Sequence, residues 1–291
     1  MSASVQLGLA FAVATAFASI VGFLYKQRGA VESPAVEWRR PLATSLALFR
    51  SRWYVLGIVI ATASWGLHVT ALSLAPITLV QSVIAGGLVL LTVIADRLFG
   101  MRVTRREWIG VGACAVGLTF LAATLDGAAG SAHSDYAVPT LALYVLAGLG
   151  IGAAAGAYGW RPGAGGIGLA ASAGLIWGAS DVAIKAQSDD LDRGLLVLAH
   201  PLTLVIIVLS AAGLVVSSRS LQIGRAVPVI AVTSAAANLT TIASGPIVFG
   251  EPLPDDALGL TVRLLAFALV IVAAALIPAP VGVTAPASAA R

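Results

Sequence analysis

The chain has 291 residues, of which 59% are hydrophobic and only 10% are charged. Soluble domains carry about a quarter charged residues, so this composition excludes an ordinary soluble protein and indicates a protein embedded in a lipid bilayer. The net charge of +4 comes from basic residues in short segments between apolar stretches, which favours membrane topology over a nucleic-acid partner. The single cysteine, Cys114, excludes an internal disulfide.

The first apolar stretch, residues 5–25, is predicted to be a membrane span and not a cleaved signal peptide. No Lys or Arg precedes it, and it is longer than the apolar region of a signal peptide. The arginine-rich segment 26–52 that follows contains apolar residues at helical spacing, which predicts a short helix lying in the inner membrane interface. A plain loop is the alternative. The residues of this pattern are Leu42, Leu46, Phe49 and Trp53.

Stretches of about 20 apolar residues are long enough to cross a bilayer, and nine segments reach that length. Helix breakers separate them, for example Pro76 between the second and third and Pro252 before the ninth. We therefore expect an all-α polytopic membrane protein with nine transmembrane helices. The segments are 5–25, 53–74, 77–99, 107–124, 138–158, 165–185, 195–216, 226–249 and 257–278.

The charges between these segments predict their orientation. Basic residues gather in alternate connecting segments, first 26–52 and then 97–106, whereas acidic residues such as Asp189, Asp190 and Asp192 gather in the others. Basic segments of membrane proteins stay in the cytoplasm. The N-terminus is therefore expected outside and the C-terminus inside a cytoplasmic membrane. The Ala- and Pro-rich residues 279–291 are expected to form a disordered tail.

The first and sixth predicted spans share a pattern at positions i, i+4, i+7 and i+11. Because the sixth span comes five spans after the first, an odd number, the two copies must cross the membrane in opposite directions. Inverted repeats of this kind are typical of secondary transporters; chance similarity between alanine-rich helices is the alternative. The predicted units are a first repeat (1–137), a linking span (138–164) and a second repeat (165–278). The matched residues are Thr15, Ser19, Gly22 and Lys26, and Gly174, Gly178, Asp181 and Lys185.

Several short motifs, taken in their order along the chain, are similar to those of a known family. The chain resembles the EamA-like drug/metabolite transporter superfamily, and most of all its nine-span branch that includes the NIPA-like magnesium transporters. The resemblance covers nearly the whole chain and implies a transporter built from two inverted halves. The motifs are Trp65-Gly66, Ala75-Pro76-Ile77-Thr78-Leu79-Val80-Gln81, Arg105-Arg106-Glu107-Trp108-Ile109-Gly110, Trp177-Gly178 with Lys185, and Gly250-Glu251-Pro252-Leu253.

Two departures from the family pattern affect what the resemblance implies. Ser82 stands where the family usually has proline, although Pro228 keeps the corresponding position in the second half. The sequence Gly100-Met101-Arg102 replaces the usual Gly-Glu-Arg, so only the second half keeps its acid, Glu251. A missing carboxylate weakens the inference that this chain handles a divalent cation, and a metal-ligand set is not predicted.

Asp181 and Arg263 are opposite charges within two apolar segments. Ionisable residues inside a membrane survive mainly where they have a partner or a wet cavity. Counted along the helices at 1.5 Å per residue, they fall in one layer with His200, His68 and Gln81, and Asn238 lies near the centre of its span. We expect this layer to bind substrate or protons. A static ion pair of Asp181 with Arg263 or Lys185 is the alternative, as is simple interfacial hydrogen bonding for the two histidines.

Further residues are weaker candidates. Lys185 is predicted mainly as a topological anchor, with a substrate role implied by the family resemblance, and Trp177 as a residue lining the cavity. Glu251 is expected to be exposed to solvent, with gating or ion attraction as the alternative. The glycine ridge of Gly148, Gly152 and Gly156 predicts close helix packing, with a homodimer as one form of it.

No catalytic or phosphate-binding motif occurs in the chain, so neither an enzyme nor a cofactor is predicted. The function expected is a secondary transporter or facilitator that moves a small solute or ion by alternating access. A magnesium transporter is a narrower alternative, although one buried carboxylate beside an arginine suits Mg²⁺ poorly. A membrane scaffold that transports nothing is the alternative of a different class.

Overall fold

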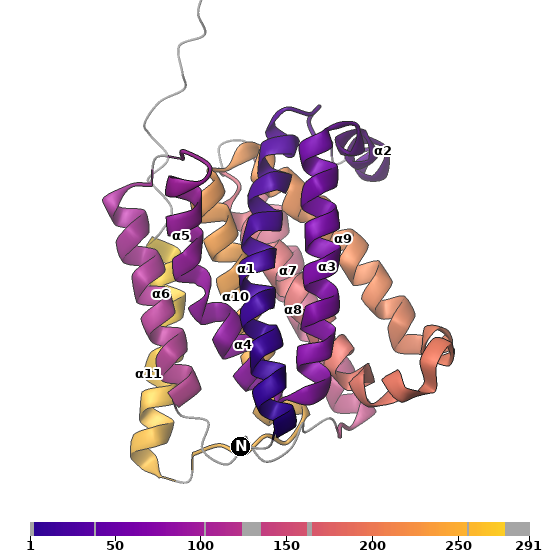
Figure 1. The fold of residues 1–291 in the computed structure, drawn as a ribbon, viewed down its shortest axis with the longest axis vertical. Coiled ribbons are helices and arrows are strands. Elements are labelled where there is room, and N and C mark those ends of the chain that lie inside the picture. Colours follow the sequence, from indigo (N-terminus) through magenta and orange to yellow (C-terminus); the bar gives the residue numbers. More distant parts are fainter. Residues whose placement is uncertain are drawn as a thin grey trace, which may run out of the picture.

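The computed structural model describes residues 3–37, 39–101, 103–123, 135–161, 165–254 and 256–276. Every regular element among these residues is helical, and the helices form one bundle (Figure 1). In chain order they are α1 (Ala3–Val31), α2 (Pro41–Ala47), η1 (Leu48–Arg50), α3 (Arg52–Leu74), α4 (Ile77–Gly86), α5 (Leu88–Arg97), α6 (Arg105–Ala123), α7 (Val138–Gly159), α8 (Ile167–Gln187), η3 (Ser188–Ala199), α9 (Pro201–Ile223), α10 (Ala226–Val248) and α11 (Ala257–Leu276).

Six of these helices are long and apolar enough to cross a membrane: α1, α3, α7, α8, α9 and α10. They support the prediction of a multi-pass membrane protein. The other predicted spans are helical as well, in α4 with α5, in α6 and in α11. A short helix, α2 with η1, also occupies the predicted amphipathic segment, whereas the tail 279–291 lies outside the described residues.

The third predicted span, 77–99, is divided. Helix α4 ends at Gly86 and α5 begins at Leu88, with Gly87 between them. Glycine is a poor helix former, and a Cβ added to Gly87 would lie only 2.6 Å from the Cβ of Ala16. The break therefore lies at a point where α1 packs closely against this segment.

The seventh predicted span, 195–216, begins later than expected. Leu195 and Leu196 belong to η3 and are 85% and 75% exposed, after a backbone reversal at Gly194 with φ 60°. Helix α9 starts at Pro201, since proline at the first helical position is favoured by its fixed φ. His200 is consequently the N-cap of α9 and not a residue inside the span.

Two buried apolar clusters reveal the directions of the helices. One, at what we call the Val5 end of the bundle, joins Val5 at the start of α1 to Ile184 near the end of α8. The other, at the Leu24 end, joins Leu24 near the end of α1 to Ala170 near the start of α8. Helices α1 and α8 are therefore antiparallel.

The other matched helices behave in the same way. Helix α3 runs from Tyr54 at the Leu24 end to Leu72 at the Val5 end, whereas α9 runs from Ile206 at the Val5 end to Leu221 at the Leu24 end. Helices α4 and α5 likewise run opposite to α10. This is the relation that an inverted repeat requires. The repeat itself, the count of nine spans and the orientation in the membrane stay predictions.

Candidate binding cavity

A cavity of about 490 Å³ lies between α1, α3, α4, α8, α9 and α10, so both halves of the chain contribute to it. This volume is within the usual range of small-molecule sites, about 300–1,000 Å³. Most of its wall is apolar, formed for example by Ile20, Ile58, Ile84 and Leu214. Polar groups form the smaller part of the wall surface, which is typical of a pocket that selects and orients a ligand.

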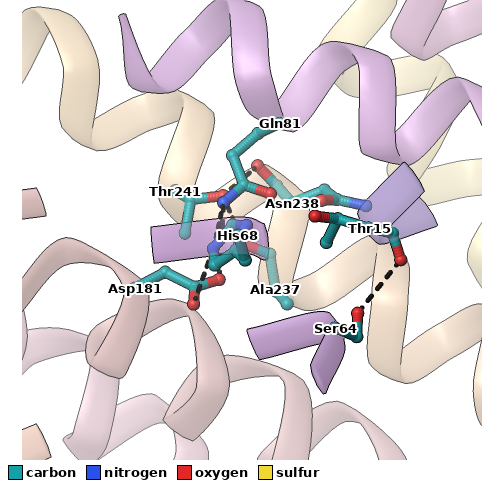
Figure 2. A network of polar contacts seen from close by, with 8 residues as sticks. All are labelled: Thr15, Ser64, His68, Gln81, Asp181, Ala237, Asn238 and Thr241. Atoms are coloured by element: carbon teal, nitrogen blue, oxygen red, sulfur yellow. Dashed lines mark hydrogen bonds and ion pairs between the residues drawn. The ribbon is translucent and has the colours of Figure 1, made fainter. Parts of the chain in front are cut away.

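Asp181 is the centre of a polar network in this cavity, which we call the Asp181 cluster together with His68 and Gln81 (Figure 2). His68 Nε2 lies 3.2 Å from Asp181 Oδ1, and Gln81 Nε2 donates to Asp181 Oδ2 at 3.4 Å. The three side chains come from α8, α3 and α4, so the cluster joins the two halves.

The hydrogen bonds of the cluster indicate which ring nitrogen of His68 carries hydrogen. A carboxylate only accepts hydrogen bonds, so the His68 Nε2 facing Asp181 carries hydrogen. The Gln81 amide nitrogen, 3.4 Å from the same Nε2, is also a donor and must be directed at the carboxylate. His68 Nδ1 is buried and has no hydrogen-bond partner among the described residues. That nitrogen can accept a hydrogen bond from a ligand.

Other polar groups hold the cluster in place. Ser64, one helical turn before His68, donates to the Thr15 carbonyl at 3.1 Å and so ties α3 to α1 (Figure 2). Thr241 Oγ1 donates to the Asn238 carbonyl at 3.1 Å, and Asn238 lines the cavity while only 4% exposed. Trp177 also lines the cavity, and its buried Nε1 has no partner in the part of the chain that the structure describes.

The predicted layer of polar residues is thus only partly assembled. Asp181, His68, Gln81, Asn238 and Trp177 line the cavity, and so does Trp65. Arg263 and His200 do not.

The expected contact between Asp181 and Arg263 does not form. Asp181 is bonded by His68 and Gln81, whereas Arg263 lies 2% exposed on α11. That helix packs mainly on α6 and does not contribute to the cavity wall. The Nη1 and Nη2 atoms of Arg263 have no hydrogen-bond partner among the described residues.

His200 is likewise displaced from its expected place. As the N-cap of α9, its Nδ1 accepts a hydrogen bond from Leu202 N at 3.2 Å, and its Nε2 lies 3.7 Å from Asp190 Oδ2. It therefore stabilises the end of a helix, outside the cavity.

Lys185 and Glu251 both contact the turn between α3 and α4, at the Val5 end of the bundle. Lys185 is fully buried, and its Nζ donates to the carbonyls of Leu72 at 2.9 Å and Ala75 at 3.3 Å. Glu251 is 3% exposed and accepts from Ile77 N at 2.9 Å. The expectation of an exposed Glu251 is wrong, because the carboxylate satisfies a free N–H group at the start of α4.

The opposite end has contacts of its own between the halves. Glu107, at the start of α6, accepts from Thr104 N at 2.7 Å and lies 3.2 Å from Arg225 Nη2, just before α10. The hydroxyls of Tyr54 and Ser218 are 2.7 Å apart. Sequence reasoning did not select these residues, since an acid at the start of a helix and an arginine in a loop are ordinary features.

The glycine ridge of α7 packs within the chain. Cβ atoms added to Gly152 and Gly156 would meet Leu175 and Ser172 of α8, whereas Gly148 has open space. The glycine ridge is therefore explained by close packing of α7 against α8, and a homodimer stays a prediction.

Comparison of the chain with protein-family models, curated proteins and solved structures finds no match. The family resemblance stays a prediction. Among the described residues, no group of three His, Cys, Asp or Glu side chains is placed to hold a metal ion.

Proposed function

We propose that this protein is a secondary transporter or facilitator that moves a small organic solute across the cytoplasmic membrane. The observation that carries the proposal is the Asp181 cluster, a partly buried acid with two polar partners, set in a cavity between two antiparallel sets of helices. An ionisable group inside a helix bundle is expensive and usually marks a pathway or a binding site.

The position of the cavity supports this function. Secondary transporters built from inverted repeats bind their substrate at the interface between the halves, near the middle of the membrane. Here α1, α3 and α4 of the first half face α8, α9 and α10 of the second across the cavity. In the proposed topology nine spans carry the chain from an outer N-terminus to an inner C-terminus.

Different contacts join the two halves at the two ends of the bundle, which is an arrangement that alternating access can use. At the Val5 end, Lys185 and Glu251 of the second half bind the α3–α4 turn of the first. At the Leu24 end, the pairs Glu107–Arg225 and Tyr54–Ser218 join the halves. Releasing one set while keeping the other would open the cavity to one side of the membrane at a time.

An organic solute fits the cavity better than magnesium does. Mg²⁺ prefers several hard oxygen ligands and sheds its water reluctantly. Among the described residues that line the cavity, Asp181 is the one carboxylate, and it is held by a histidine and an amide.

The test is flux in proteoliposomes with a panel of labelled amines, amino acids, carboxylates and Mg²⁺. We expect wild type to move at least one organic solute and Asp181→Asn to reduce that flux about 100-fold or more, because the substitution removes the charged acceptor of the hydrogen bonds from His68 and Gln81. The matched control is Asp96→Asn on α5, where the carboxylate lies outside the cavity and is half exposed. That variant should keep full flux.

Two results would contradict the proposal. If no solute moves and Asp181→Asn unfolds the protein, the cluster is structural and the scaffold alternative is preferred. If Mg²⁺ alone moves, and the gene rescues a strain unable to import magnesium, the narrower ion-transport alternative replaces the organic solute.

A further inference from the structure

A second charged group lines the same cavity, on α1 towards the Leu24 end. Lys26 is only 5% exposed, although its place after an apolar span resembles that of a lysine anchored at the membrane surface. Its ammonium lies 3.9 Å from the centre of the Phe23 ring, so the side chain folds back along α1. The backbone of Lys26 is packed against Gly57 of α3, where an added Cβ would lie 2.6 Å from Lys26 N.

No hydrogen bond or ion pair joins Lys26 Nζ to another residue in the described part of the chain. The ring of Phe23 offsets only part of the cost of removing an ammonium from water. A buried cation without a counter-ion in a cavity wall therefore needs an anion or water from outside the protein.

Lys185, at the matched position of the second half, behaves differently. Its ammonium is bonded to the carbonyls of Leu72 and Ala75 and lies outside the cavity wall. The unsatisfied state of Lys26 is thus a property of this site and not of the repeated pattern.

The two charged groups of the cavity wall are well separated. From Gly57, which touches the Lys26 backbone, to His68 of the Asp181 cluster is eleven residues along α3, or about 16 Å at 1.5 Å per residue. Because Lys26 folds back towards Phe23, the distance between the charges is on the order of 10 Å. Apolar side chains, among them Ile20, Ile58 and Leu214, line the cavity together with these groups.

We infer that Lys26 binds the anionic oxygens of the transported solute. The substrate class is an organic anion, a carboxylate or phosphonate, with an apolar middle and a hydrogen-bonding group that reaches the Asp181 cluster. This inference rests on the proposed function, since it names the substrate class of the same cavity. Compact zwitterions with adjacent charges do not match charges on the order of 10 Å apart.

Equilibrium binding to the purified full-length protein in detergent tests this inference without requiring transport. The probes are para-hydroxyphenylbutyrate, para-hydroxyphenylpropylphosphonate and the neutral analogue para-hydroxyphenylbutyramide, whose phenolic hydroxyl is the group that reaches the Asp181 cluster. Binding is followed by calorimetry and by the fluorescence of Trp65 and Trp177, which line the cavity. Wild type should bind at least one of the two anions about tenfold or more tightly than the amide.

Substitutions then assign the preference to one residue. Lys26→Met should remove the preference for anions and leave the affinity for the amide unchanged, whereas Lys26→Arg should keep the preference. Arg28→Gln is the control, because it removes a half-exposed cation from α1 outside this cavity. Size-exclusion profiles and melting curves confirm that each variant is folded, and Lys26→Gln takes the place of Lys26→Met if Lys26→Met does not fold.

The outcomes separate the two proposals. Equal affinity for acid and amide, no binding of either anion at millimolar concentration, or an anion preference that survives in Lys26→Met would overturn the role of Lys26. If the anions bind through Lys26 and no solute crosses proteoliposomes, the transport function fails and the anion site stands. The ratio of carboxylate to phosphonate affinity shows which anion the cavity accepts better.

Discussion

Lys26 and Lys185 occupy the same position in the two matched helices but have opposite surroundings. Lys26 lines the cavity and has no hydrogen-bonding partner among the described residues, whereas Lys185 is fully buried against two backbone carbonyls. Equal spacing in the sequence has therefore produced one group available to a ligand and one group that holds the fold together.

The matched residues that precede these lysines in α1 and α8 also have different surroundings. Thr15 and Ser19 of α1 line the cavity, whereas their matched residues in α8, Gly174 and Gly178, pack directly against α10. A Cβ at Gly174 would clash with the carbonyl oxygen of Thr233. The comparison teaches that small residues bring α8 and α10 together while larger polar residues keep α1 apart from them, so the cavity forms beside α1.

The largest effect should come from exchanging each lysine for methionine. Lys185→Met should lower the free energy of unfolding by about 2–4 kcal/mol, because two buried carbonyls lose a charged donor. Lys26→Met should leave stability unchanged or raise it, since a desolvated ammonium is removed. Thermal unfolding in detergent measures both, and equal losses would show that the two lysines are structurally alike.

A smaller effect is expected from closing the contact between α8 and α10. Gly174→Ala should cost about 1–3 kcal/mol, since the new methyl group meets backbone and cannot be accommodated by rotating a side chain. Gly148→Ala on α7 is the control, because nothing lies within 4 Å of its added Cβ. If Gly174→Ala and Gly148→Ala had the same melting temperature, the distance between α8 and α10 would not be tightly fixed.

The smallest effects concern the contacts at the Leu24 end. Glu107→Ala should cost about 1 kcal/mol through the lost cap of the α6 N-terminus. Arg225→Gln should cost below about 1 kcal/mol, because its side chain is 49% exposed and Glu107, which is 2% exposed, keeps its hydrogen bonds from Thr104. Denaturation curves would contradict this order if Arg225→Gln were the more damaging of the two.

Much of the helical architecture could be predicted because apolar length and loop breakers determine where a chain can cross lipid. The exceptions have local causes. The break at Gly87 depends on how closely Ala16 approaches, and the late start of α9 depends on Gly194 and Pro201. Apolarity alone does not distinguish a buried helix from an exposed short turn, so Leu195 was included in a span that begins after it.

The site could be predicted only in part, because counting residues gives the depth of a side chain and not the face that it occupies. Asp181, His68 and Gln81 share both depth and face, and they meet. Arg263 was placed at a suitable depth, but α11 packs on α6, away from the cavity. Lys26 was missed as a site residue, since its burial depends on contacts with Phe23 and Gly57.

The most direct test of the account is whether water reaches the cavity in the membrane. In a Cys114→Ser background, Ser234→Cys places a thiol in the cavity wall, and Leu265→Cys places one on the outer surface of α11, where Leu265 is 64% exposed. A charged, water-soluble thiol reagent should modify Ser234→Cys at least about tenfold faster in membrane vesicles, because thiolate forms only where the site is hydrated. Equal, negligible labelling at both positions would contradict a hydrated binding cavity.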